Sequence, residues 1–327
     1  MTDRTAERDR SDADESAPVA LRAGLIAMGA GVCGAIQPEL NSELGSRLGS
    51  SLVAAFINFA VALLVALTVL SRRPATRRHL AQLSTWPVPR WTFTAGLGGV
   101  VVVLAGVVTV ERLGVAIFSI AFFAGQMSFG LVVDRLGIGP GGQRPVTATR
   151  VGAATMAVAA VVLSQVGQPT GEPAPAAIAF VVAAGAASAL QSAFNGRIAA
   201  TIGDPLAPTV VNVTVGTVVL GGLVAGAALT GSVPPLEWPS EPWLYAGGVL
   251  GVTIVLSLAA ATAAVGVLRT TVAMLAAQLI GAFAVDWAVR GDPPTAGVVV
   301  GALLIVVAVL VVNRTPSPSR ISTTLSP

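Results

Sequence analysis

Long apolar stretches separated by short polar segments dominate the pattern of this chain. Eight uncharged windows approach or exceed the roughly 20 residues that span about 30 Å of hydrocarbon. They are Leu48–Ser71, Trp91–Val110, Leu113–Val133, Val151–Gly171, Pro173–Gly196, Pro205–Leu236, Pro242–Leu268 and Pro293–Asn313. Two further windows, Ala23–Pro38 and Thr270–Val285, contain only 16 residues each. We expect Arg22 and Arg269 to extend these two spans, with their charges at the interface. The pattern predicts an all-α polytopic membrane protein with ten transmembrane helices.

Polar residues inside the apolar stretches occur twice, in the same order. One series, Gln37, Asn41, Gly49 and Asn58, recurs 154 positions later as Gln191, Asn195, Gly203 and Asn212. A second series, Trp91, Gly99, Gln126 and Asp134, recurs 152 positions later as Trp243, Gly251, Gln278 and Asp286. These matches in register indicate a tandem duplication in which the repeat is the architectural unit.

Five predicted helices per copy is an odd number, and this sets the orientation of the second copy. A copy with five spans begins on one side of the membrane and ends on the other, so we expect the second copy to be inverted. The predicted organisation has two inverted five-helix repeats between two disordered cytoplasmic tails. The tails are 1–19 and 314–327, and the repeats are 20–168 and 169–313.

Composition and charge agree with a membrane protein and suggest its orientation. Hydrophobic residues make up 54% of the chain and charged residues 11%, and the mean hydropathy of +0.80 leaves too little polar surface for a soluble domain. With the N-terminus inside, only Arg47, Arg112 and Arg290 of the 19 basic residues fall outside the cytoplasmic segments. This asymmetry predicts a multi-pass protein of the cell (inner) membrane with both termini in the cytoplasm.

Residue types that serve catalysis or cofactor binding are scarce. Cys33 is the only cysteine, His79 is the only histidine, and no GxxxxGK[ST] phosphate loop is present. We therefore expect no enzyme activity, no metal site and no cofactor. The net charge of +3 follows from the topology and gives no reason to propose nucleic acid. The expected partners are the lipid bilayer and a small-molecule substrate, and homodimerisation is left open.

Amide side chains inside the predicted spans are the candidate substrate-binding residues. Gln37 and Asn41 are four residues apart and share one face of a helix, as do Gln191 and Asn195. In an inverted pair these faces are expected to oppose each other near the midplane, where transporters of this design bind substrate. Amides suit a neutral or zwitterionic polar solute because they bind it without a buried charge. The alternative is that they hydrogen-bond helices together.

A second group of amides recurs in both halves. Gln126 and Gln278, each on the fourth predicted helix of its half, are expected to support the same cavity. Asn58 and Asn212 are interpreted first as residues that brace neighbouring helices.

Three acidic residues and one proline receive separate interpretations. Glu39 has no acidic counterpart in the second half and is a candidate coupling acid, although it lies about 200° around the helix from Gln37. A solvated position at the lip of the cavity is the alternative. Asp134 and Asp286 are interpreted as interfacial anchors or helix caps. Pro38 removes a backbone donor, so we expect it to break the first helix near the site.

Two sequence patterns resemble those of a known family. They are G-A-x-Q-x-x-x-N followed by a glycine and S-L-V-A-A-F, and A-G-Q-M-S-F-G-L-V-V-D-R-L-G. These resemble the YdcZ-type branch of the drug/metabolite transporter superfamily, in a fused, double-length form that covers about residues 22 to 313. The resemblance implies a ten-helix, EamA-like inner-membrane transporter, an exporter, built from inverted repeats around a central cavity. The chain departs from the pattern at Pro38, Glu39 and Ala277.

The combined interpretation is a secondary transporter that exports a small polar or amphipathic metabolite or drug by alternating access of its two repeats. A non-transporting membrane scaffold or sensor is the alternative, and a soluble domain or long structured tail would favour it.

Overall fold

Helices are the only regular elements in the part of the chain that the computed structural model describes, residues 3–167, 175–291 and 293–314. The nine α-helices of these ranges are α1 (Asp3–Leu48), α2 (Ser51–Ser71), α3 (Pro74–Ala81), α4 (Ala95–Leu136), α5 (Ala148–Ser164), α6 (Pro175–Ile202), α7 (Leu206–Leu229), α8 (Gly247–Arg290) and α9 (Ala296–Arg314). Three short 3-10 helices are η1 (Leu83–Thr85), η2 (Arg90–Thr94) and η3 (Pro242–Ala246). The prediction of an all-helical chain is confirmed.

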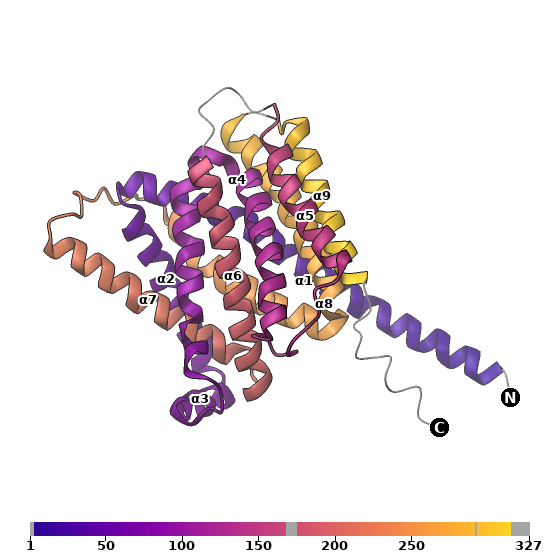
Figure 1. Cartoon of the computed structure of the whole chain (residues 1–327). Helices are drawn as coiled ribbons and strands as arrows, with labels where there is room; N and C mark the ends of the chain where they lie inside the picture. Colours follow the sequence, from indigo (N-terminus) through magenta and orange to yellow (C-terminus); the bar gives the residue numbers. More distant parts are fainter. Residues whose placement is uncertain (1–2, 168–174, 292, 315–327) are drawn as a thin grey trace.

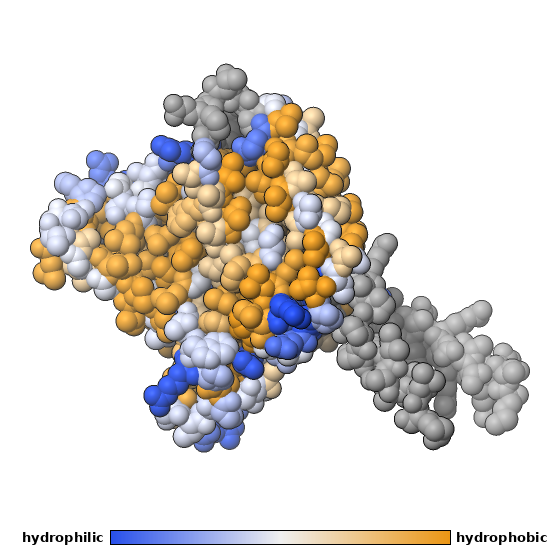
Figure 2. All heavy atoms as spheres, in the orientation of Figure 1, coloured by the Kyte–Doolittle hydropathy of each residue, from blue (hydrophilic) through white to orange (hydrophobic). Residues whose placement is uncertain are grey.

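Most of these helices are suited to a bilayer. Seven helical stretches of the described residues are long and apolar enough to cross a membrane, and α5 and α9 are shorter apolar helices. Apolar side chains cover most of the visible face, between hydrophilic patches at its upper and lower ends (Figure 2). Because the exterior is apolar, lipid rather than water is the solvent that matches it.

The two longest helices are each interrupted at a glycine. Gly114 in α4 has φ 76° and ψ 160°, and Gly266 in α8, which lies 152 positions later, has φ 81° and ψ 165°. Only glycine adopts this backbone conformation readily, because a Cβ atom would clash. Each break lies within two residues of the boundary between two windows that the sequence predicts as separate spans: Gly114 follows the first residue of Leu113–Val133, and Gly266 lies two residues before the end of Pro242–Leu268.

The helices pair across the two halves of the chain. In Figure 1 the central helices α1, α8, α4 and α6 have α2 and α7 on one side and α5 and α9 on the other. The most extensive packing joins α1 to α8 and α4 to α6, and α5 also packs on α9 and α2 on α7. The first helix of each half therefore packs on the long, broken helix of the other half.

Glycines bring the central helices close together. A Cβ atom at Gly31 of α1 would meet the backbone of Met274 in α8, and one at Gly185 of α6 would meet the backbone of Phe122 in α4. The two contacts are equivalent, because Gly185 lies 154 positions after Gly31 and Met274 lies 152 positions after Phe122. Such contacts between small residues are a common way for helices to associate in a membrane.

The boundaries of the first span differ from the prediction. The expected break at Pro38 is wrong, because α1 continues through it to Leu48. The ring of Pro38 packs against Gly106 of α4, whose missing side chain leaves space for it: a Cβ atom at Gly106 would lie 3.6 Å from the Cβ atom of Pro38. The helical segment beyond Pro38 carries an ion pair, in which Arg47 lies 2.6 Å from Glu43, one turn away.

Both ends of the chain and one loop also bear on the predicted boundaries. Helix α1 begins at Asp3 and thus includes most of the segment that we expected to be a disordered tail. The second predicted tail, apart from Arg314, and the boundary between the repeats at 168 and 169 lie outside the described residues. Helix α7 ends at Leu229, before the predicted limit, because Gly231 adopts φ 68°. The N–H of Ser232 then donates to the carbonyl of Ala227 at 2.8 Å and closes the helix end.

Candidate functional site

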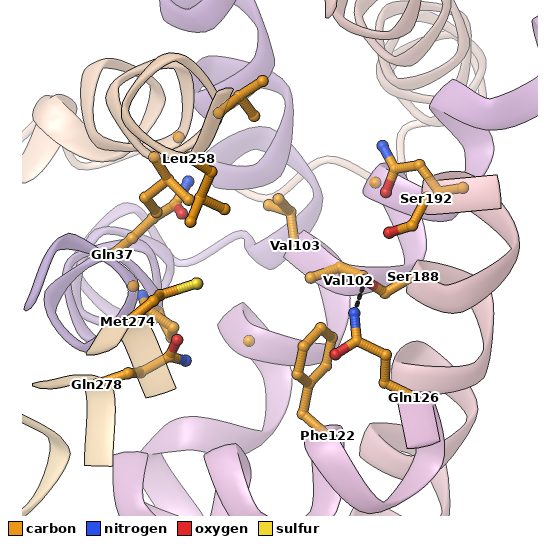
Figure 3. Close-up of a pocket in the computed structure, with 18 of the residues that line it drawn as sticks. Gln37, Val102, Val103, Phe122, Gln126, Ser188, Ser192, Leu258, Met274 and Gln278 are labelled. Atoms are coloured by element: carbon orange, nitrogen blue, oxygen red, sulfur yellow. Dashed lines mark hydrogen bonds between the residues drawn. The ribbon is translucent and has the colours of Figure 1, made fainter. Parts of the chain in front are cut away.

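A cavity of about 670 Å³ lies between the two halves of the molecule. Side chains from α1, α2, α4, α6, α7, α8 and α9 line it. All eight amide residues that the sequence singles out are among them: Gln37, Asn41, Asn58, Gln126, Gln191, Asn195, Asn212 and Gln278. In the close-up, Gln37 and Gln278 lie on one side of the cavity, opposite Gln126 and Ser188 (Figure 3). The walls are therefore the pair α1 and α8 and the pair α4 and α6.

Gln37 is held against the N-terminal end of α8. Its Nε2 donates to the backbone carbonyl of Gly247 at 2.9 Å and approaches Oδ1 of Asn58 at 3.5 Å. A Cβ atom at Gly251, one turn further along α8, would lie 2.8 Å from the same Nε2. The amide of Gln37 therefore occupies space that only a glycine leaves free.

Asn41 and Asn58 are buried together beside Gly247. A Cβ atom at Gly247 would contact the Oδ1 atoms of both side chains. In the second half the equivalent residues interact directly, because Nδ2 of Asn212 donates to Oδ1 of Asn195 at 2.7 Å. Asn58 and Asn212 thus contact the residues that the sequence assigned to the site, in addition to any bracing role.

The two glutamines of α4 and α8 are in different environments. Nε2 of Gln126 donates to the hydroxyl of Ser188 at 3.2 Å (Figure 3). The equivalent contact in the other wall lacks the hydroxyl, since Gly34 occupies the corresponding position, 154 residues before Ser188. Oε1 of Gln278 is buried, and no described residue donates a hydrogen bond to it. The two walls therefore have equivalent glutamines but different hydrogen bonds.

Gln191 completes the set of predicted residues. A Cβ atom at Gly99 would lie 3.1 Å from Nε2 of Gln191, which repeats the relation between Gly251 and Gln37. Ser192, the next residue of α6, is exposed and also lines the cavity (Figure 3).

The cavity wall is uncharged and partly aromatic. Among the described residues that line it, none is Asp, Glu, Lys, Arg or His. Phe118 and Phe122 stack with ring centroids 6.1 Å apart, and Phe122 meets Phe123 edge-on at 5.6 Å. Together with Phe59 these rings give the cavity an apolar section beside its amides. The site can offer hydrogen bonds and aromatic contact, but no countercharge.

Glu39 does not line this cavity. It lies with Ser42, Glu43, Ser46 and Glu111 in a separate hollow of about 200 Å³. The role of a coupling acid stays a prediction, and its position is away from the amides, as its angle on the helix indicates. No group of three or more metal-ligating side chains occurs among the described residues.

Sequence reasoning missed the partners of the amides and part of the role of Asp286. Gly99 and Gly251 were visible as repeated positions, but only packing shows that they make room for Gln191 and Gln37. Asp286 does cap a helix, yet the helix is α4 and not its own: it accepts hydrogen bonds from Val115 and Ala116. Repeated glycines next to repeated amides were the available signal.

Two comparisons with known proteins add to this geometry. A search of curated proteins returned no match to the chain. The model of one family, described as "Putative inner membrane exporter, YdcZ", matches residues 23–163 and again residues 176–311. The two matches cover most of the chain, one in each half, as the repeated residues indicate. The chain therefore belongs to the YdcZ family of inner membrane exporters, in a double-length form.

Proposed function

We propose that this protein is a secondary transporter that exports a small polar or amphipathic solute by alternating access. In this proposal the chain crosses the membrane ten times, because α4 and α8 each supply two spans that meet at Gly114 and Gly266. The two halves are inverted five-helix repeats, and the termini are cytoplasmic. Family membership supports export from the inner membrane, and the arginine distribution supports the orientation.

The observation that carries the proposal is the convergence of eight amides, four from each half, on one uncharged cavity. Equivalent residues from two repeats meet there, which is the arrangement expected of a substrate site at a repeat interface. The cross-pairing of α1 with α8 and of α6 with α4 supports the inverted arrangement.

Unpaired amide oxygens favour a bound solute or a second arrangement of the same helices. Oδ1 of Asn41, Oδ1 of Asn212 and Oε1 of Gln278 are buried without a hydrogen-bond partner among the described residues. Each unpaired group costs about 1–3 kcal/mol. Hydrogen bonds from a bound solute, or from a second arrangement of the helices, would regain part of this free energy.

The chemistry of the wall defines the cargo as a solute without net charge. A cation or an anion would leave water without a counterion, at a cost of several kcal/mol in a membrane. An uncharged or zwitterionic molecule can be bound by the amides through its polar end and by Phe118, Phe122 and Phe123 through its apolar end.

A thermal-shift screen of purified protein in detergent tests this function. The probes are neutral, zwitterionic, cationic and anionic molecules of matched size, for example benzamide, phenylalanine, benzylammonium and benzoate. A ligand at 100 times its Kd stabilises the folded state by about 2.7 kcal/mol. We expect neutral or zwitterionic probes to raise the unfolding temperature, and Asn41→Ala combined with Asn195→Ala to abolish the shift.

The matched control replaces two exposed amides outside the cavity, Gln82→Ala with Gln143→Ala, and is expected to keep the full shift. If a probe stabilises the cavity variant as much as the wild type, the amides are structural and the site lies elsewhere. If no probe acts on any variant, the scaffold or sensor function is favoured.

A further inference from the structure

The breaks in α4 and α8 are equivalent in sequence and in backbone geometry, but their surroundings differ. Gly114 is buried within an unbroken run of buried residues from 113 to 121. Gly266 is exposed, and no described atom lies within 4 Å of the position that its Cβ atom would take. One end of the molecule is therefore tightly packed at its break, and the other end is not.

A carboxylate closes the packed end. Oδ1 of Asp286 accepts the N–H of Val115 at 2.7 Å, and Oδ2 accepts the N–H of Ala116 at 2.9 Å. These donors belong to the first turn of the helix that restarts after Gly114, where backbone N–H groups lack helical partners and a negative charge is favoured. Asp286 thus caps one broken helix from the far end of the other and joins α8 to α4.

The equivalent carboxylate at the open end is engaged elsewhere. Asp134, which lies 152 positions before Asp286, forms an ion pair with Arg150 in the first turn of α5. Helix α9, the counterpart of α5, contains no charged residue before Arg314. The position equivalent to Arg150 in the second half, 152 residues later, is occupied by Ala302.

The cavity extends toward the open end. Thr262 and Thr270, four residues on either side of Gly266, both line it. After Gly114, the first residue that lines the cavity is Phe118, and residues 115–117 between them are buried. The break at Gly266 is thus the one that borders the cavity from both sides.

We infer that Asp286 and Asp134 are the two gating residues of the transport cycle, each of which caps the broken helix at its own end when that end is closed. The inference rests on the proposed alternating access. This structure is the state closed at Gly114, with Asp134 held by Arg150 away from Gly266. In the opposite state Asp286 releases Val115 and Ala116, and Asp134 leaves Arg150 to cap the helix that restarts after Gly266.

Side-specific labelling of the cavity tests the gate. The reporter is Ser192→Cys in a chain that also carries Cys33→Ser, and a membrane-impermeant maleimide is added to right-side-out and to inside-out vesicles. The readout is the ratio of labelling from the Gly266 face to labelling from the Gly114 face. Asp286→Asn keeps only one of the two acceptor oxygens and removes the charge, so we expect it to lower this ratio about fivefold, the effect of losing one typical hydrogen bond.

Two further variants separate gating from simple damage. Arg150→Gln frees Asp134 and is expected to lower the ratio as well, and adding Asp134→Asn in that background is expected to restore it. A destabilised protein would not regain its labelling ratio on a second substitution, so this pair carries the test even if Asp286→Asn does not fold. Glu111→Gln removes an exposed carboxylate near the Gly114 end and is expected to leave the ratio unchanged.

Two negative outcomes have different meanings. If the wild-type reporter reacts from both faces and neither Asp286→Asn nor Arg150→Gln alters the ratio, the gate is overturned and alternating access stands. If the reporter reacts from one and the same face in every variant, both the gate and alternating access are wrong.

Discussion

Gly251 faces the amide of Gln37, and Gly99, its counterpart in the first half, faces the amide of Gln191. At both positions the missing side chain is what allows a glutamine to lie between two helices. Gly247 serves Asn41 and Asn58 in the same way. At the scale of single residues, the amide site therefore depends on these glycines as much as on the amides, because a side chain at any of them would occupy the space of an amide.

We predict that Gly251→Ala destabilises the folded protein by about 1–3 kcal/mol, the usual cost of overpacking. The new methyl group would lie 2.8 Å from Nε2 of Gln37 and would force that amide away from the carbonyl of Gly247. Thermal unfolding in detergent measures the loss. Gly226→Ala on α7 is the control, because no described atom lies within 4 Å of its Cβ position. Equal unfolding temperatures for the two variants would contradict the packing.

Asp204 joins separate elements in the turn between α6 and α7. One carboxylate oxygen accepts the N–H of Leu206 at 2.9 Å at the start of α7, and the other lies 3.2 Å from Nδ1 of His79 in α3. Burial alone raises the pKa of Asp204, but hydrogen bonds from Thr76, Leu206 and His79 outweigh it, so the pKa lies below its ordinary value. The short helix α3 is thereby fixed to the end of the bundle.

The lowered pKa of Asp204 predicts the direction of a pH effect. The ionised carboxylate stabilises the fold at pH values above about 4, the ordinary pKa of an aspartate, and this stabilisation is lost as the pH falls through the lower folded-state pKa. Asp204→Asn is expected to lower the unfolding temperature at neutral pH and to flatten its fall on acidification. Glu237→Gln, at an exposed position, is the control. A fall as steep in Asp204→Asn as in the wild type would exclude this role.

The sequence allowed the spans to be predicted but not all of their ends. Apolar windows reproduce the cores of α2, α7 and α9, because burial in lipid requires uncharged residues over a fixed length. The window of the first span stopped too early because Glu39 is charged, whereas α1 continues to Leu48. Near the end of α1, Arg47 pairs with Glu241, which lies 194 positions away. Long-range partners of this kind leave no trace in a local window.

For the cavity as a whole, the repeated amides were predicted and their hydrogen bonds were not. Repetition at intervals of 154 and 152 residues singled out all eight residues, but Asn58 and Asn212 were interpreted first as helix braces and not as cavity residues. The asymmetry between Ser188 and Gly34, or between Arg150 and its missing counterpart, appears only when helices from different halves are placed together. The contacts that distinguish the halves therefore had to come from the structure.

The proposed topology predicts opposite labelling of two equivalent loops. Ser84→Cys, in the segment between α2 and α4, and Ser232→Cys, after α7, are both exposed positions and are introduced with Cys33→Ser. An impermeant maleimide is expected to reach Ser232→Cys in right-side-out vesicles and Ser84→Cys in inside-out vesicles. Labelling of both from the same side would show that the two halves are not inverted.

The pairing of α1 with α8 has a consequence for synthesis. Gln37 donates to the carbonyl of Gly247, 210 residues further along the chain. At a ribosomal rate of about 5–20 residues per second, this acceptor emerges roughly 10–40 s after the donor. During that interval α1 carries its amides in the bilayer without their final partners, and the first half cannot complete its own core. The two copies therefore do not fold one after the other as independent units, and the early helices depend on temporary partners until α8 arrives.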